Sequence, residues 1–190
     1  MAGIQEIEIK FQIEDGQAFA SRLPAAGFHL VTARTHELNT LYDLRGAPLR
    51  SRGALLRLRQ YGTIWTLTYK DKSLVADGHK SRREIETRIA DGAAMAGILG
   101  ALGFKPSFAY EKFRSEWADE TGHVVIDETP IGNFGEIEGP PAWIDTTAGK
   151  LEIGKEQYIT ASYAELFAQW RVRTRSAAAN MTFHEVGATG

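Results

Sequence analysis

The sequence predicts an α+β protein, in which a closed eight-stranded antiparallel β-barrel with a charged interior is flanked by helices. Three observations support this fold class: about eight segments alternate apolar and polar residues with period two, five of them carry paired charges on the polar parity, and capped helical segments interrupt them. The predicted strands cover residues 4–13, 40–43, 54–60, 64–71, 82–89, 110–117, 123–127 and 135–138.

The bulk composition limits the kind of protein this is. With 190 residues and 43% hydrophobic composition, one domain over residues 1–175 is expected. The 22 basic and 24 acidic residues leave a formal net charge of -2, so neither nucleic acid nor a membrane is an expected partner. Cysteine is absent, which excludes disulfides and thiolate metal sites. No secretory signal or apolar span is visible, and we expect a cytoplasmic monomer or homodimer.

The first predicted strand has a charged face. Residues two apart on a strand point to the same side, so Glu6, Glu8 and Lys10 share one face and apolar residues share the other. The same spacing recurs on four further strands, at Arg57 and Arg59, at Arg82, Glu84 and Glu86, at Lys112 and Arg114, and at Glu136 and Glu138.

Paired charges on strands have two explanations. Any one of these faces would suit the solvent side of a half-buried antiparallel sheet. Five are harder to explain in this way, because Glu and Lys are depleted in strands. A barrel whose interior carries the charges accounts for all five, and its closure removes the exposed sheet edges.

Helices are predicted between the strands, at residues 15–26, 91–102 and 162–170, with a weaker signal at 145–151. Pro24 is expected to end or bend the first helix. Asp91 is a suitable N-cap for the second, and Ser162 with Glu165 forms a capping box at the start of the third. Residues 176–190 lose periodicity and are predicted to be a flexible tail.

The residue types of the predicted interior indicate the chemistry of a ligand. Carboxylates without His or Cys favour hard divalent cations such as Mg²⁺ or Mn²⁺, and Arg and Lys favour phosphate oxygens. No glycine-rich loop ending in Gly-Lys-Ser or Gly-Lys-Thr and no dinucleotide fingerprint is present. A metal-bound oligophosphate is therefore the expected ligand. The candidate carboxylates are Glu6, Glu8, Glu84, Glu86, Asp127, Glu136 and Glu138.

Several motifs in order resemble one known family. The most specific is the Glu-x-Glu-x-Lys segment at residues 6–10. Further similar pieces lie at residues 41–43, 56–59, 66–70, 81–86, 111–114, 127–139 and 162–166. Through these pieces the chain resembles, nearly end to end, the CYTH proteins or triphosphate tunnel metalloenzymes, which include class IV adenylate cyclases, thiamine triphosphatases and inorganic triphosphatases.

The resemblance implies roles for individual residues. Glu6, Glu8, Glu136 and Glu138 would bind Mg²⁺ or Mn²⁺, with Asp127, Glu84 and Glu86 adding to the acidic floor. The triphosphate would be gripped by Lys10, Arg57, Arg59, Lys70, Lys112 and Arg114. Arg82 suits an ion pair as well as a substrate contact, and Lys72 and Lys80 are expected to be solvated in a hairpin loop. Lys10 and Tyr42 are the catalytic candidates, although a strand-end tyrosine such as Tyr42 more often serves packing.

Three functions are compatible with the sequence. The resemblance favours metal-dependent hydrolysis of inorganic triphosphate, thiamine triphosphate or a nucleoside triphosphate, since hydrolysis needs fewer special contacts. The alternative is a class IV adenylate cyclase that converts ATP to cyclic AMP and pyrophosphate. Trp65, Trp117 and Trp143 could stack on its base, although a tryptophan on a strand more often serves packing. A non-catalytic binder of polyphosphate or nucleotide is the third, and the metal-type glutamates disfavour it.

Overall fold

The computed structural model describes residues 4–187, and no helix in this range is long and apolar enough to cross a membrane. The strands are β1 (Ile4–Ile13), β2 (His29–Asp43), β3 (Leu55–Tyr61), β4 (Ile64–Lys70), β5 (Leu74–Ala76), β6 (His79–Ile89), β7 (Lys105–Ala118), β8 (His123–Thr129) and β9 (Gly132–Glu138). The helices are α1 (Gly16–Arg22), α2 (Pro48–Ser51), α3 (Gly92–Ala101), α4 (Pro141–Lys150), the 3₁₀ turn η1 (Lys155–Gln157), α5 (Tyr163–Thr174) and α6 (Phe183–Gly187).

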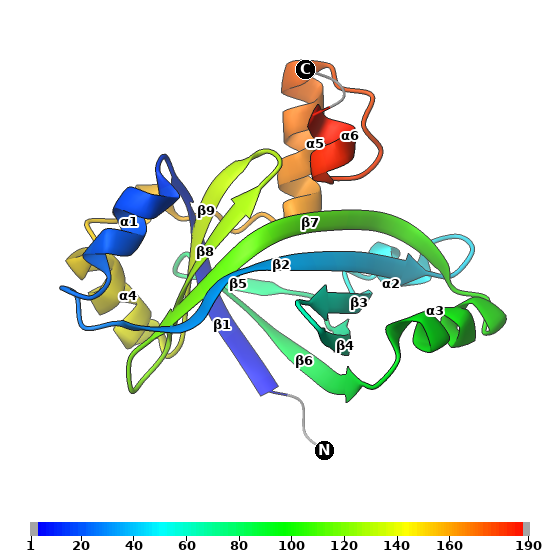
Figure 1. Cartoon of the computed structure of the whole chain (residues 1–190), viewed down its shortest axis with the longest axis horizontal. Coiled ribbons are helices and arrows are strands. Elements are labelled where there is room, and N and C mark those ends of the chain that lie inside the picture. Colours follow the sequence, from blue (N-terminus) through cyan, green and yellow to red (C-terminus); the bar gives the residue numbers. More distant parts are fainter. Residues whose placement is uncertain (1–3, 188–190) are drawn as a thin grey trace.

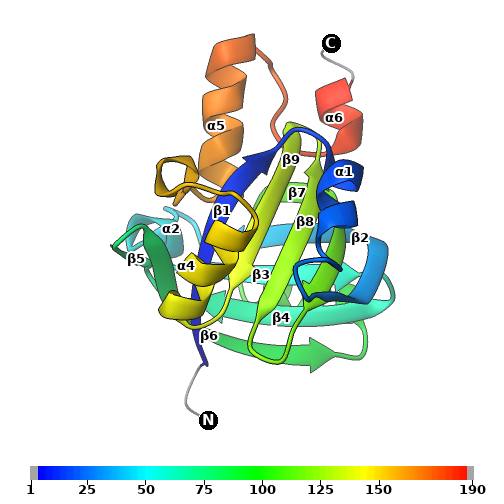
Figure 2. The same cartoon turned by 90° about the vertical axis from the view of Figure 1, so that its left-hand side faces the viewer.

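Eight of the strands close into a barrel (Figures 1 and 2). The order is β1-β9-β8-β7-β2-β3-β4-β6, and β6 pairs back to β1, with every pairing antiparallel. The short β5 pairs with β6 beside this ring. The closed eight-stranded antiparallel barrel with flanking helices is therefore confirmed.

The strand β2 is much longer than the predicted segment 40–43. It pairs with β7 along most of its length, from His29 to Asp43, with several register shifts on the way. The early part of β2 was missed because most of its residues are exposed, so period-two alternation is weak there. β5 was missed because three residues are too few to show a period.

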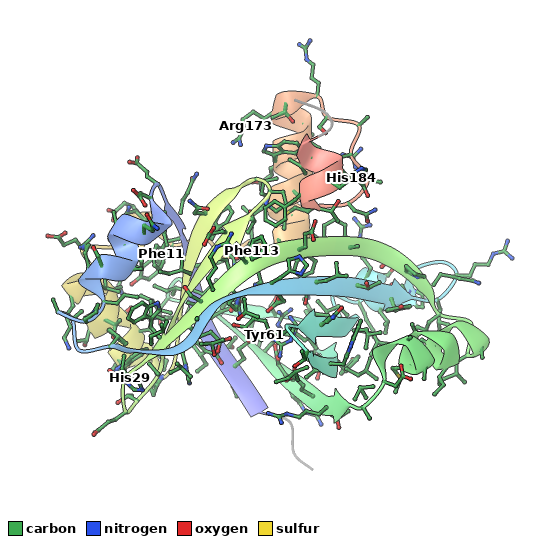
Figure 3. All side chains as sticks on the ribbon, viewed as in Figure 1. Phe11, His29, Tyr61, Phe113, Arg173 and His184 are labelled. Carbon is green, nitrogen blue, oxygen red and sulfur yellow. The ribbon has the colours of Figure 1, made fainter. Side chains whose placement is uncertain are left out.

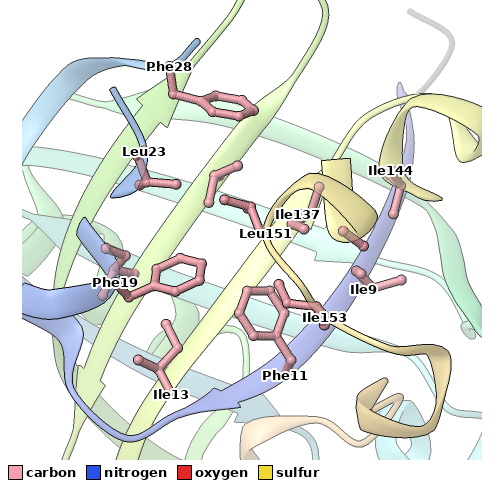
Figure 4. Close-up of a cluster of buried hydrophobic side chains, with 13 residues drawn as sticks. Ile9, Phe11, Ile13, Phe19, Leu23, Phe28, Ile137, Ile144, Leu151 and Ile153 are labelled. Carbon is pink, nitrogen blue, oxygen red and sulfur yellow. The ribbon is translucent and has the colours of Figure 1, made fainter. Parts of the chain in front are cut away.

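The apolar parity of the strands faces outward and is covered by helices. Ile9 and Phe11 of β1 are buried against Phe19 of α1 and Ile144 of α4, in the cluster shown in Figure 4. Figures 1 and 2 agree that α1 and α4 lie over the outer face of β1, β8 and β9. Burial of this face therefore fixes the polar parity toward the barrel interior.

The helix boundaries follow their local signals. α1 ends at Arg22, just before Pro24, as a proline requires. The Asp91 carboxylate accepts a hydrogen bond from the backbone N–H of Ala94 at the start of α3. Ser162 forms a capping box with Glu165 at the start of α5.

The predicted flexible tail is wrong for the described residues 176–187. The N–H of Met181 donates to the carbonyl of Ala109 in β7, and its side chain is fully buried. The N–H of Phe183 donates to the Glu111 carboxylate, after which α6 begins. A few specific contacts fix this segment to the barrel, and such contacts produce no periodic pattern in the sequence. Residues 188–190 lie outside the described range.

One packing prediction arises from β9, where Gly135 pairs with Phe11. A Cβ at Gly135 would overlap the buried Phe11 ring, so Gly135→Ala is expected to lower the free energy of unfolding by about 1–3 kcal/mol. Gly97 in α3 has open space around it, and Gly97→Ala should raise that free energy by about 0.5–1 kcal/mol. Urea unfolding of both variants checks the pair, and a neutral Gly135→Ala would contradict this packing.

Candidate active site

The barrel encloses a cavity of about 550 Å³, which is lined by charged side chains of the polar parity. Figure 3 shows nitrogen- and oxygen-bearing side chains among the strands of the barrel. Cations and carboxylates line it in nearly equal numbers. The cations are Lys10, Arg57, Arg59, Lys70, Lys80, Arg82, Lys112 and Arg114, and the carboxylates are Glu6, Glu8, Glu84, Glu86, Glu116, Glu136 and Glu138. A lumen of this kind is costly unless its charges pair with one another or with a ligand.

Helix α5 contributes an aromatic side to this cavity through Tyr163. The Tyr163 ring lies 4.2 Å from the Nζ atom of Lys10 and 4.8 Å from that of Lys112, measured to its centroid. Its hydroxyl donates to Oδ2 of Asp127 at 2.6 Å. Cation–π contacts of this kind hold the two ammonium groups in place, so α5 shapes the interior of the barrel.

A dense ion-pair network surrounds Asp127, which is fully buried. Lys112 donates to Oδ2 at 2.8 Å, and Arg114 donates through Nε to Oδ1 at 2.7 Å and through Nη2 to Oδ2 at 2.6 Å. Arg114 also donates to Glu136, which pairs with Lys10. Burial alone would raise the pKa of Glu136, but the charges of Lys10 and Arg114 hold that pKa well below its usual range.

A second buried carboxylate, Glu37, lies behind the cations of β3 and β7. Its oxygens are 3.5 Å from Nζ of Lys112 and 4.0 Å from both Nη1 of Arg59 and Nε of Arg114. The side-chain amide of Asn39 donates to Oε1 of Glu37 at 2.8 Å. Burial would raise the pKa of Glu37, but Lys112, Arg114 and Arg59 keep this pKa far below its ordinary value. Glu37 is therefore a permanent negative charge.

The opposite wall, formed by β1, β4 and β6, carries a carboxyl pair. Glu6 lies 3.2 Å from Nζ of Lys70 and 3.5 Å from Nε of Arg82, and Glu84 pairs with the same two cations. Burial and a hydrogen bond to Glu6 raise the pKa of Glu84 to about 7. For Glu6 the raising effect of burial is outweighed by that hydrogen bond and by the two cations, and its pKa falls to about 2. The pair therefore shares one proton below neutral pH.

Glu8 and Glu138 face each other across the β1–β9 pairing. Glu8 has a cationic partner, since Lys80 donates to it at 3.1 Å. In residues 4–187 no ion pair or hydrogen bond reaches the Glu138 carboxylate. Burial and the charges of Glu6, Glu8 and Glu136 raise the pKa of Glu138 to about 7. The negative charge around Glu138 therefore exceeds the positive charge beside it.

Comparison with known proteins identifies the family. The CYTH domain matches residues 5–163, which is most of the chain. The chain belongs to the CYTH domain family. A protein of Methanocaldococcus jannaschii named "putative adenylate cyclase" is 28% identical over 172 residues, covering 85% of this chain and 97% of its own length.

Solved structures of two further proteins share the fold. A "putative adenylate cyclase" of Vibrio parahaemolyticus has a TM-score of 0.75 and 18% identity, over 87% of this chain and 99% of that one. A Hippeastrum protein described as a "putative adenylyl cyclase" with a dominant triphosphatase activity has a TM-score of 0.65 and 19% identity, over 87% of this chain and 95% of that one.

Most of the predicted site residues of this CYTH domain line the cavity, and two do not. Tyr42 is 7% exposed and packs with Leu58 and Leu99 on the outside of the barrel, so its role as a catalytic candidate is wrong. It follows Leu41, which lines the cavity, and adjacent residues of a strand point to opposite faces.

Asp127 also differs from its predicted role. Its two oxygens already accept hydrogen bonds from Lys112, Arg114 and Tyr163, and it has no exposed surface from which to reach a ligand. We therefore no longer count Asp127 among the candidate metal ligands. Its carboxylate instead orients the side chains of Lys112 and Arg114.

Sequence reasoning missed several residues of the site. Glu37 and Asn39 lie on the part of β2 that was not predicted, and Glu116 lies two residues beyond Arg114, on the same face of β7. Lys80 was expected in a solvated loop, but it is a buried residue of β6 beside Glu8. Period-two counting extended three residues back from residue 40 would have found Asn39 and Glu37, and two residues back from residue 82 it would have reached Lys80. Glu116 already lay inside the predicted strand 110–117, on the parity of Lys112 and Arg114.

The glutamates of β1 and β9 fit a divalent cation in charge and chemistry. Carboxylate oxygens are the ligands that Mg²⁺ and Mn²⁺ prefer. Two directly opposed carboxylates, Glu8 and Glu138, repel each other unless a cation lies between them. In residues 4–187 no three His, Asp or Glu side chains are already gathered as a ligand set. A cation would therefore have to draw Glu8 and Glu138 together.

The raised pKa of Glu84 predicts a pH dependence of stability without metal. Its pKa of about 7 in the folded protein lies above the ordinary 4.5, so between these pH values the folded state binds more protons than the unfolded state. Stability should fall as pH rises through this window. In EDTA, we expect the Tm to drop between pH 5 and pH 8 by about 4 °C more in the unmodified protein than in Glu84→Gln. Thermal melting followed by circular dichroism checks this, and parallel pH profiles would contradict it.

Proposed function

We propose that this CYTH domain protein hydrolyses a triphosphate inside the barrel with the help of a divalent cation. The observation that supports this most is the lining of the cavity, where Arg and Lys side chains lie among glutamates and, within residues 4–187, no ion pair or hydrogen bond reaches the Glu138 carboxylate. A polyphosphate with a bound metal ion carries the complementary charges of both kinds.

The phosphate oxygens would be held by cations on β1, β3, β4, β6 and β7. Arg57 and Arg59 present planar donor groups from adjacent inward positions of β3, which suits two oxygens of one phosphate group. Lys10, Lys70, Lys112, Arg114 and Arg82 extend the same surface around the cavity. These groups would orient the phosphate chain and stabilise charge on its equatorial and leaving oxygens.

Glu6, Glu8, Glu136 and Glu138 would hold Mg²⁺ or Mn²⁺. When bound, such an ion supplies Lewis-acid polarisation of a phosphoryl oxygen and a more acidic water. The side chains of β1 and β9 are placed for it by the register that sets Glu8 opposite Glu138 and Lys10 opposite Glu136.

The aromatic residues favour hydrolysis over cyclisation. Trp117 and Trp143 pack in the outer core around α1 and α4, and Trp65 packs under α3, so none of the three is placed to stack on a nucleotide base. Among the described residues, the aromatic side chains that line the cavity are Tyr110 and Tyr163, together with His123. The cavity thus offers contacts for phosphate and few for a base.

Adenylate cyclisation is the second candidate function, supported by the names of the Methanocaldococcus and Vibrio relatives. The triphosphatase activity attributed to the Hippeastrum protein supports the first. In a cyclase the same cations would hold the triphosphate of ATP while its ribose hydroxyl attacks the α-phosphorus.

Incubation with tripolyphosphate, thiamine triphosphate or ATP, with Mg²⁺ or Mn²⁺, separates these functions. Release of orthophosphate supports hydrolysis, and pyrophosphate with cyclic AMP supports cyclisation. If none of the three substrates is turned over with either metal, both enzyme functions are wrong.

A further inference from the structure

Glu37 is the part of the interior that neither the proposed metal site nor the phosphate contacts require. It lies on β2 between two cation-bearing strands, opposite Lys112 of β7 and Tyr61 of β3. Its side chain has no exposed surface, and it does not line the cavity. A bound phosphate therefore cannot touch it, and any effect on a ligand must pass through its neighbours.

Those neighbours are three of the cations that face the cavity. Arg59, Lys112 and Arg114 all line it, and each lies within 3.5 to 4.0 Å of a Glu37 oxygen. In residues 4–187, the only hydrogen bond to the Glu37 carboxylate comes from Asn39, and its Oε2 atom accepts none. Glu37 thus provides negative charge without occupying the N–H groups that a phosphate would use.

A buried charge at this distance changes how strongly the cavity attracts an anion. Charges interact more strongly in a protein interior than in water, because the surroundings screen them less. With Glu37 ionised, part of the field of the three cations is cancelled from behind. Without it, a polyanion and its anionic products would be held more tightly, and products would leave more slowly.

We propose that Glu37 is a positioning residue that moderates the affinity of the Arg59, Lys112 and Arg114 cluster for phosphate groups, so that products can leave. This inference rests on the proposed function for its effect on turnover. Its effect on binding does not depend on turnover. Asn39 contributes to the same effect, because its hydrogen bond fixes the orientation of the Glu37 carboxylate.

The test compares the unmodified protein with Glu37→Gln, which removes the charge and keeps the shape. Calorimetry in EDTA measures the Kd of tripolyphosphate, and steady-state kinetics with Mg²⁺ measure kcat. We expect Glu37→Gln to bind tripolyphosphate at least about fivefold more tightly and to turn it over at least about fivefold more slowly. A merely structural role would weaken binding. Unchanged or weaker binding by a folded Glu37→Gln would overturn the inference.

The matched control is Glu128→Gln. Glu128 is also a strand glutamate paired with an arginine, Arg34, but its ion pair is largely exposed. Its replacement is expected to leave Kd and kcat within about twofold of the unmodified protein. An equal tightening in both variants would show a general charge effect and would overturn a specific role for Glu37.

Asn39→Asp gives a second test should Glu37→Gln fail to fold. It adds negative charge beside Glu37 and should weaken tripolyphosphate binding at pH 8 at least about threefold; unchanged or tighter binding would overturn the inference. If the unmodified protein binds tripolyphosphate but does not hydrolyse it, the proposed function is wrong, and the binding comparison still decides the role of Glu37. If it neither binds nor hydrolyses tripolyphosphate, both proposals are wrong.

Discussion

Replacement of Glu138 by glutamine is expected to lower turnover of the triphosphate substrate at least about 100-fold and, at pH 8, to raise the Tm of the metal-free protein. Within residues 4–187 no cation forms an ion pair with this carboxylate, and burial together with the charges of Glu6, Glu8 and Glu136 raises its pKa to about 7. Gln keeps the size and removes both the charge and the repulsion. A residue whose loss stabilises the fold while removing activity is one retained for function.

Melting curves in EDTA and initial rates with Mg²⁺ check both parts of the Glu138→Gln prediction. Glu116→Gln is the matched control, because Glu116 also lines the cavity but accepts a hydrogen bond from Thr32 and lies outside the proposed metal group. We expect the control to keep its rate within about fivefold. If Glu138→Gln keeps more than about a tenth of the rate, Glu138 does not belong to the metal site.

Asp127→Ala is expected to lower the free energy of unfolding by about 3–5 kcal/mol, since Lys112 and Arg114 lose the buried carboxylate to which both donate. The same change releases the Tyr163 hydroxyl and with it the aromatic side of the cavity. Because Lys112 and Arg114 would lose their orientation toward phosphate, turnover is expected to fall at least about 100-fold even where the variant is folded.

The adjacent residue offers the control for Asp127. Glu128 points to the other side of β8 and makes an exposed ion pair with Arg34, so Glu128→Ala should cost about 1 kcal/mol or less. Urea unfolding of the two variants gives the comparison. Equal losses of stability would show that burial of the Asp127 network contributes little.

The fold could be predicted because most of the strands show, in their own alternation of residues, which face lies inside the barrel. In β1 the alternation of Glu6, Glu8 and Lys10 with Ile9 and Phe11 separates the interior from the outer core, and the structure has the same two faces. Paired charges on five strands indicated closure, since open sheets rarely bury so many. Helix caps such as Asp91 and Ser162 worked because they are local interactions.

The error on Tyr42 and the omission of Glu37 and Asn39 have one physical origin, which is the assignment of parity on β2. The predicted segment covered only residues 40–43, so Tyr42 was judged from its position at a strand end. Followed back along the same strand, Leu41, Asn39 and Glu37 share the inward parity and Tyr42 lies on the other face. The exposed start of β2 has no apolar partner face, and only its pairing with β7 reveals it.

The role of Asp127 could not be read from the sequence for a different reason. The sequence around a carboxylate that binds a metal ion does not differ from the sequence around one that pairs with an arginine. The role of Asp127 is determined by β7, which brings Lys112 and Arg114 beside its carboxylate, and by Tyr163 of α5, which lies 36 residues further along the chain. Such contacts between distant segments appear only once the barrel is assembled.

The most direct test of the account is a crystal structure of the protein with Mn²⁺ and tripolyphosphate, with the metal located by its anomalous scattering. We predict a manganese peak within about 2.5 Å of carboxylate oxygens from Glu138 and at least one other glutamate of β1 or β9, with phosphate oxygens bound by Arg57, Arg59 and Arg114. Tripolyphosphate bound outside the barrel, or manganese bound away from these glutamates, would contradict it.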